Sequence, residues 1–224
     1  AFTKYPRERV VRGGYAGPEA SMRRDQKKYG AFQSERKILE DALTLFGSRR
    51  LSEKGTAFAR YPFAFLVEAA DDICYLIIDL EDAVRLGIIG LHEVEAELET
   101  IIAANPEEGS RGIEAERAAS GSETDRMAYF RAKAINSLIF QCAAVFSGRA
   151  REIAQGSYAS SLTDEIPSSA ALAAIWDVSR EKLYRYKPVL EIEAAGFEIV
   201  SGLLEKLVEA ALVKKDKRNQ QLLE

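Results

Sequence analysis

Six carboxylates lie within a strongly apolar stretch, residues 68–82, and they are the groups of this sequence best suited to chemistry. They are Glu68, Asp71, Asp72, Asp79, Glu81 and Asp82. Carboxylates are costly to bury unless they are paired, hydrogen-bonded or bound to a metal. On a helix, Asp71, Tyr75 and Asp79 lie along one stripe, because residues four apart are neighbours on the surface. The stripe predicts a carboxylate that holds a hard or borderline cation, followed by a phenol and a second carboxylate against which a sugar could lie.

The same stretch predicts the helix that positions these groups. Apolar residues recur with helical period from Phe65 to Leu80, which is the pattern of a helix with a buried face. We expect this helix to begin near Pro62 and to run to about Leu86. Gly87 follows directly and is suited to end it.

The helical pattern continues through the rest of the chain, and we find no convincing strand or internal repeat. Further helices are expected over residues 34–46, 92–104, 125–146, 169–187 and 188–215. The long helix over 125–146 places an apolar face toward a core, formed by Met127, Phe130, Ala134, Leu138 and Cys142. The predicted fold class is therefore all-α.

A family resemblance rests on the central helix. Glu-Ala-Ala-Asp-Asp-Ile-Cys-Tyr from Glu68, followed by Ile-Ile-Asp-Leu-Glu-Asp up to Asp82, resembles the last metal-ligand helix of the bacterial deoxyguanosinetriphosphate triphosphohydrolases, which are HD-domain enzymes. The resemblance implies hydrolysis of a dNTP, here dGTP, to deoxynucleoside and tripolyphosphate, with a divalent metal ion (Mg, Mn, Fe, Co or Ni). It implies that Asp71 is a metal ligand, that Tyr75 packs against the deoxyribose, and that Asp79 binds the 3′-hydroxyl.

Two basic elements extend the resemblance toward the start of the chain. Lys4-Tyr5-Pro6 is similar to a family element whose Lys and Tyr contact phosphate oxygens. In a second element, a Lys before an aromatic-Gly pair also reaches the phosphates, which points to Lys28, with Lys27 as the alternative. A further match, the weakest, places Glu193 in a helix near the base-binding end of the pocket. The matches run from Ala1 to about Leu207.

Basic residues are concentrated in residues 1–36. This region contains Lys4, Arg7, Arg9, Arg12, Arg23, Arg24, Lys27 and Lys28. A triphosphate needs a set of Lys and Arg donors, but a basic stripe can also follow a nucleic-acid backbone. Arg126 and Arg131 could reach the same pocket, or could pair with Glu123 and Asp125.

The chain also departs from the family pattern. In the family, the metal-binding His, the His-Asp pair and the catalytic His/Glu pair lie upstream of the Lys-Tyr-Pro element. Here the only histidine is His92, which is expected at the surface near a helix start. A single Asp is not a metal site, because stable sites need three or four ligands. Glu68 could orient a metal-bound His by accepting a hydrogen bond from the ring N–H that does not face the metal.

We therefore expect the C-terminal part of a longer enzyme, catalytically inactive alone and without a catalytic residue of its own. Residues 1–104 would form the C-terminal part of an HD-type catalytic core, with the phosphate-binding loops and the last metal-ligand helix. The chain would therefore hold only part of an HD-domain-like multi-helix bundle. Residues 105–224 would form a helical C-terminal extension. The alternative is a catalytically inert relative that binds nucleotides or single-stranded DNA, and a third reading is a helical interaction domain.

Composition agrees with a cytoplasmic protein without a membrane partner. Hydrophobic residues make up 47% and charged residues 29% of 224, and the net charge is −4, which gives no overall attraction to nucleic acid or anionic lipid. No apolar run approaches the roughly 20 residues that span a bilayer. The two cysteines, Cys74 and Cys142, are expected as buried thiols. The resemblance further implies a homo-oligomer, such as a hexamer, and single-stranded DNA as an effector.

Overall fold

The computed structural model describes residues 3–9, 24, 27–52, 56–105 and 121–212. The chain divides into two compact units, Ala1–Trp176 and Asp177–Glu224. The predicted division at residue 104 stays a prediction. The helices are α1 (Arg36–Leu45), α2 (Pro62–Arg85), α3 (Glu95–Ala103), α5 (Glu123–Gly148), α6 (Ala150–Ala154), α7 (Leu162–Glu165), α8 (Ser169–Lys182) and α9 (Lys187–Leu212), with 3₁₀ turns at Gln33–Glu35 and Leu91–Glu93.

The all-α prediction is confirmed. Among the described residues, extended pairing is limited to isolated bridges, namely Arg7 with Ala57, Glu8 with Ala31 and Arg50 with Phe58. These bridges tie together residues 7–8, 31, 50 and 57–58, all before α2, and they do not form a sheet. None of the helices in the described part of the chain is both long and apolar enough to cross a membrane.

Helix α2 has the bounds that its sequence predicts. Pro62 occupies the first turn, where its fixed φ suits a helix and its missing N–H is not needed. At the other end, Gly87 adopts a φ of 69°. The Gly87 N–H donates to the Val84 carbonyl at 3.0 Å, and the Ile88 N–H donates to the Ala83 carbonyl at 2.9 Å. This is a Schellman motif, which satisfies the last carbonyls of the helix.

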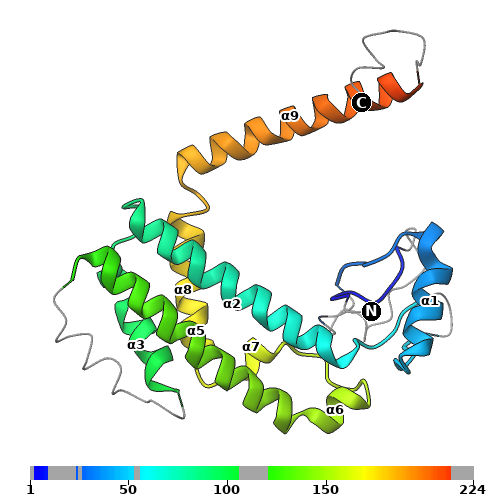
Figure 1. Ribbon diagram of the computed structural model, residues 1–224, viewed down its shortest axis with the longest axis horizontal. Helices are drawn as coiled ribbons and strands as arrows, with labels where there is room; N and C mark the ends of the chain where they lie inside the picture. Colours follow the sequence, from blue (N-terminus) through cyan, green and yellow to red (C-terminus); the bar gives the residue numbers. More distant parts are fainter. Residues whose placement is uncertain (1–2, 10–23, 25–26, 53–55, 106–120, 213–224) are drawn as a thin grey trace. The chain divides into compact units, whose positions relative to one another are not determined.

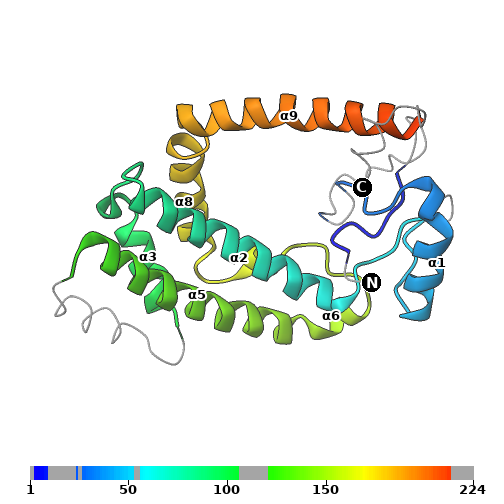
Figure 2. The ribbon, with the colours of Figure 1, turned by 45° about the horizontal axis from the view of Figure 1, so that its top comes forward.

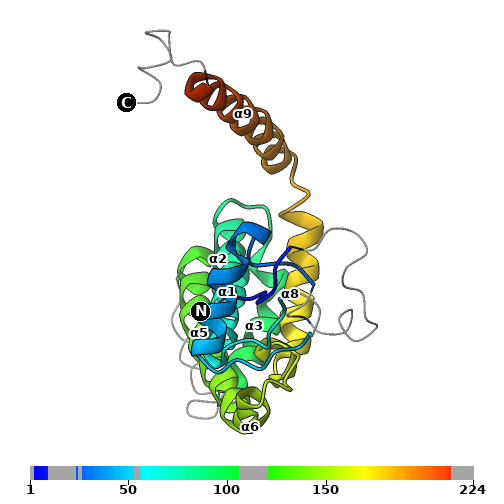
Figure 3. The ribbon, with the colours of Figure 1, turned by 90° about the vertical axis from the view of Figure 1, so that its right-hand side faces the viewer.

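The core of the first unit lies between α2, α3 and α5. Helices α2 and α5 lie side by side along much of their length (Figures 1 and 2), and α3 packs against α5. Figure 3 shows these three helices gathered together when the chain is seen from the right-hand side of Figure 1. The face predicted for α5 is buried at all five positions, namely Met127, Phe130, Ala134, Leu138 and Cys142.

One prediction about the cysteines is correct and one is wrong. Cys142 is buried between the helices, and burial raises the pKa of its thiol to about 11. Cys74 is exposed instead. It follows the buried Ile73 on α2, and one residue turns a helix by about 100°, which carries the side chain off the core face.

Helix α9 makes up most of the second unit and is apolar over much of its surface. Its exposed apolar side chains include Ile192, Phe197, Ile199, Val200 and Leu204. The break between α8 and α9 falls over residues 183–186, close to the boundary predicted at Pro188. The predicted end at residue 215 lies outside the described residues.

The contrast between two neighbours on α5 tests the assigned core. Leu138 is fully buried, whereas Ile139 is 54% exposed. Leu138→Ala is expected to lower the free energy of unfolding by about 2–5 kcal/mol, because it removes buried methyl groups and leaves a cavity. Ile139→Ala should cost less than about 1 kcal/mol. Urea unfolding of both variants checks this, and equal losses would contradict the assignment of this face to the core.

Candidate functional site

A cavity of about 800 Å³ opens in the first unit between α2, α7 and α8. Its volume lies within the range of sites for small organic ligands. From α2 it is lined by Asp71, Asp72, Tyr75 and Leu76. The opposite wall comes from α7 and α8, where Thr163 and Asp164 are polar and Leu172, Ala173 and Trp176 are apolar. The cavity therefore has a polar region and an apolar region.

The predicted stripe on α2 faces this cavity in part. Asp71 and Tyr75 are exposed and line it, and the Tyr75 side chain is 57% exposed. Asp79 lies one turn further along α2 and is half-buried. It is outside the set of residues that line this cavity. The structure thus brings the first two predicted residues to one cavity and places the third beyond it.

A buried ion pair lies next to the lining residue Arg24. Arg60 and Glu68 are both almost fully buried, and Nη1 of Arg60 donates to the Glu68 carboxylate at 2.5 Å. Nε of Arg60 also donates to the backbone carbonyl of Lys4 at 2.8 Å. The guanidinium is therefore satisfied by a carboxylate and a carbonyl together, which is what a buried charge requires.

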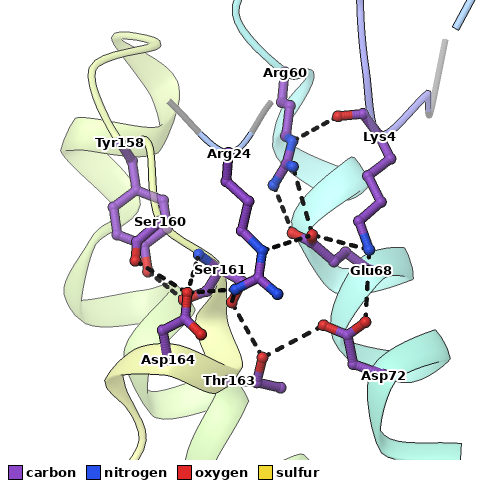
Figure 4. Close-up of polar contacts among 10 residues, drawn as sticks. All are labelled: Lys4, Arg24, Arg60, Glu68, Asp72, Tyr158, Ser160, Ser161, Thr163 and Asp164. Atoms are coloured by element: carbon purple, nitrogen blue, oxygen red, sulfur yellow. Dashed lines mark hydrogen bonds and ion pairs between the residues drawn. The ribbon is translucent and has the colours of Figure 1, made fainter. Parts of the chain in front are cut away.

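Glu68 also gathers two more cations, as Figure 4 shows. Nζ of Lys4 lies 3.1 Å from Glu68 and 3.5 Å from Asp72, and Nε of Arg24 lies 3.8 Å from Glu68. Burial alone would lower the pKa of Lys4, but the carboxylates of Glu68 and Asp72 outweigh burial and raise that pKa. Glu68 therefore anchors a cluster of three basic residues at the edge of the cavity.

Arg24 links α2 to α7 across the polar region of the cavity. Its Nη1 donates to Asp164 at 2.5 Å and to the Ser161 hydroxyl at 2.8 Å. Thr163 lies beside the same contacts, and its hydroxyl donates to Asp72 at 3.5 Å. The two walls of the cavity are thus joined by polar side chains at this end.

Two of the carboxylates that line the cavity, Asp72 and Asp164, have pKa values shifted in opposite directions. Burial is the largest influence on Asp72 and raises the pKa of its carboxyl, although Lys4 opposes the rise. Burial would also raise the pKa of Asp164, but hydrogen bonds from Arg24 and Ser161 outweigh it and lower that pKa. The surroundings therefore hold Asp164 in the ionised form more firmly than Asp72.

The two predicted phosphate elements lie against each other. Gly30 donates its N–H to the Arg7 carbonyl at 3.1 Å. A Cβ atom at Gly30 would stand 2.5 Å from the Tyr5 carbonyl oxygen, so only glycine permits this approach. Nζ of Lys28 lies 5.9 Å from the centre of the Tyr5 ring, within cation–π range. Lys4, Tyr5 and Lys28 thus come from neighbouring segments.

The remaining predicted residues are not among those that line the cavity. Arg126 pairs with Glu95, and Arg131 lies 3.3 Å from Glu81. These partners differ from Glu123 and Asp125, which the sequence suggested. Lys27 and His92 are exposed on the first unit, and Glu193 is exposed on α9 in the second unit.

Sequence reasoning missed several residues of the cavity as site residues. They are Arg24, Asp72, Thr163, Asp164 and Trp176. Arg24 was recognisable only as one cation of a basic region. The segment with Thr163 and Asp164 belongs to a stretch rich in small residues, whose sequence gave no signal for its position opposite α2.

The described residues do not by themselves form a metal site. They contain no group of three or more His, Cys, Asp or Glu side chains arranged to hold an ion. Asp71 offers one carboxylate to the cavity, whereas a stable transition-metal site takes three or four ligands. The role of Asp71 as a metal ligand stays a prediction.

Comparison with known proteins identifies the family. No family model matches the chain. A deoxyguanosinetriphosphate triphosphohydrolase-like protein of Synechocystis is 31% identical over 228 residues, covering 99% of this chain and 48% of the relative. A protein of the same description from Pseudomonas aeruginosa is 29% identical and covers 83% of this chain and 41% of its own length. A deoxyguanosinetriphosphate triphosphohydrolase of Salmonella paratyphi A is 28% identical, over 80% of this chain and 36% of the relative.

The chain belongs to the deoxyguanosinetriphosphate triphosphohydrolase family, as the resemblance at α2 indicated. It spans about half the length of the Synechocystis relative and less than half of the other two.

Removing the Glu68 carboxylate tests how much the cluster contributes to the stability of the fold. Glu68→Ala is expected to lower the free energy of unfolding by about 3–5 kcal/mol, because Arg60 would remain buried without a counter-ion. Replacing both Arg60 and Glu68 with Leu should recover much of that loss. Urea unfolding measures both, and Asp82→Ala, which breaks the exposed pair with Arg85, serves as a control with a cost below about 1 kcal/mol. A cost for Glu68→Ala no larger than this control would contradict the cluster.

The Arg24–Asp164 pair predicts a pH dependence of stability. The folded pKa of Asp164 lies below its ordinary value, so its stabilising effect is present above about pH 4 and is lost as pH falls through the folded pKa. Asp164 is half-exposed, and we expect Asp164→Asn to cost up to about 1 kcal/mol at pH 7. The difference from wild type should shrink toward zero below about pH 4. Thermal melts across this range measure it, and a difference that grows in acid would contradict the assignment.

Proposed function

We propose that the chain forms part of a metal-dependent dNTP triphosphohydrolase that converts dGTP and water to deoxyguanosine and tripolyphosphate. The observation that carries the proposal is the cavity that joins Asp71 and Tyr75, the residues to which the family resemblance gives metal and sugar roles. The names of the relatives support the same activity.

Tyr75 and Asp79 are proposed to bind the deoxyribose. The exposed ring of Tyr75 offers a flat apolar surface for a sugar face. A ribose would bring its 2′-hydroxyl against this ring, which favours deoxy sugars. Asp79, one turn further along α2, would accept a hydrogen bond from the 3′-hydroxyl.

Lys4, Tyr5 and Lys28 are proposed to bind the triphosphate. Lys4 stands beside the cavity through its pairing with Asp72, and Gly30 holds the Lys28 segment against Tyr5. Three donors from two adjacent segments suit a polyanion. Arg126, Arg131 and Glu193 stay weaker proposals as ligand-binding residues.

Asp71 is proposed to contribute one ligand to a divalent metal ion. The described residues do not complete the site, so we derive no reaction step through the metal and assign no catalytic residue within this chain. We expect the chain alone to be inactive. Assembly into an oligomer, such as a hexamer, activation by single-stranded DNA and a cytoplasmic location are proposals that rest on the family resemblance and composition.

A second proposal is a catalytically inert relative that binds nucleotides or single-stranded DNA. The basic residues Lys4 and Arg24, which lie together at Glu68, favour it, because a basic stripe can also follow a nucleic-acid backbone. Binding of dGTP or DNA by the whole gene product, loaded with metal and without turnover, would support this second proposal over the first.

Substitution of Asp71 tests the proposed activity. In the whole gene product that contains this chain, Asp71→Ala is expected to slow tripolyphosphate release from dGTP by at least about 100-fold, because a metal ligand is lost. Released tripolyphosphate and deoxyguanosine are measured by ion-exchange and reversed-phase chromatography.

Cys74→Ser is the matched control for this test. Cys74 is exposed on the same helix and does not line the cavity, so its substitution should leave the rate within about twofold. A rate unchanged by Asp71→Ala, with an active wild type, would overturn the role of Asp71.

A further inference from the structure

Among the described residues that line the cavity, Arg24 is the one with a cationic side chain. It reaches the cavity from the basic N-terminal region and lies between Asp164 on one side and Glu68 with Asp72 on the other (Figure 4). Its side chain is 35% exposed. A guanidinium presents several N–H donors in a fixed plane, a geometry that matches phosphate as well as carboxylate.

The carboxylates around Arg24 differ in how strongly other residues bind them. Glu68 is buried and bound to Arg60 at 2.5 Å, and Asp72 is engaged by Lys4. Asp164 is 47% exposed. It also accepts from the Ser161 backbone N–H at 3.4 Å in the capping box of α7. Asp164 would therefore keep water and a backbone donor if Arg24 turned away.

The cavity has a polar region at Arg24 and an apolar region at Trp176. Thr163 contacts Asp72 at the polar end, whereas α8 advances about 10 Å from Ser169 to Trp176. A ligand with a charged group at one end and a flat apolar ring at the other fits this arrangement. Its charged group would lie next to the Arg24–Asp164 pair.

We propose that Arg24 binds a phosphate group of the ligand in this cavity. Until a polyphosphate is bound, Asp164 accepts the hydrogen bonds of the Arg24 guanidinium in its place. The inference rests on the proposed function and deepens it, because it adds a donor and a competing carboxylate to the triphosphate site. The ligand phosphate carries more negative charge than one carboxylate and binds the guanidinium through two parallel hydrogen bonds. Asp164 then acts as an internal competitor that weakens phosphate binding.

A double-mutant cycle tests the exchange. Binding of magnesium tripolyphosphate to the 224-residue chain is measured by titration calorimetry. Arg24→Gln is expected to weaken binding about 10-fold, and Asp164→Asn to strengthen it several-fold. If Asp164 acts through Arg24, the effect of Asp164→Asn should fall below about twofold in the Arg24→Gln background, since the two side chains would be coupled.

A neighbouring ion pair, in which only the carboxylate belongs to α7, supplies matched controls. Arg149 binds Glu165 of α7 at 2.9 Å, and neither residue lines the cavity. Arg149→Gln and Glu165→Gln should each change tripolyphosphate binding by less than about twofold. Arg24→Lys, which keeps the charge but loses the planar donor set, should bind more weakly than wild type and more tightly than Arg24→Gln.

Three outcomes would overturn the inference. They are no binding of tripolyphosphate by wild type, no effect of Arg24→Gln, or a strengthening by Asp164→Asn that persists in full without Arg24. A parallel titration with deoxyguanosine distinguishes failure of the Arg24 proposal from failure of the proposed function. If deoxyguanosine binds and Tyr75→Ala weakens its binding, the proposed nucleoside site stands although the role of Arg24 falls.

Discussion

The buried contact between Arg60 and Glu68 is the interaction on which the cavity depends. Glu68 projects from the core face of α2, and Arg60 comes from the segment just before that helix. A charge in this position must be neutralised. The same carboxylate then attracts Lys4 and Arg24, so one buried group draws two separate parts of the N-terminal region onto α2. The position of the basic residues follows from this single anion.

The helices were predictable because each carries its own signals. Pro62 and Gly87 mark the ends of α2, and the apolar positions of α5 from Met127 to Cys142 repeat with a helical period. Such signals are local, and a sequence displays them without knowledge of the fold. The approach of Gly30 to Tyr5 is different, because it depends on contact between segments that no periodicity relates.

The cavity was predictable on one wall only. Asp71 and Tyr75 were found because four-residue spacing places them on one stripe of α2. Thr163 and Asp164 face them from 90 residues further along, in the short helix α7, which has too few residues for a periodic pattern. The pairing of Arg24 with Asp164 spans 140 positions of sequence. Only tertiary packing determines which carboxylate such an arginine meets.

Gly30 fixes the register between two basic segments. Its α-hydrogen side faces the Tyr5 carbonyl and the Thr3 hydroxyl with no room for a methyl group. If either segment shifted by one residue relative to the other, Tyr29 or Ala31 would take the place of Gly30 against Tyr5. Both residues carry a Cβ atom, for which there is no room. Insertions and deletions are therefore excluded from the immediate neighbourhood of this residue, and variation in length has to be accommodated elsewhere in the chain.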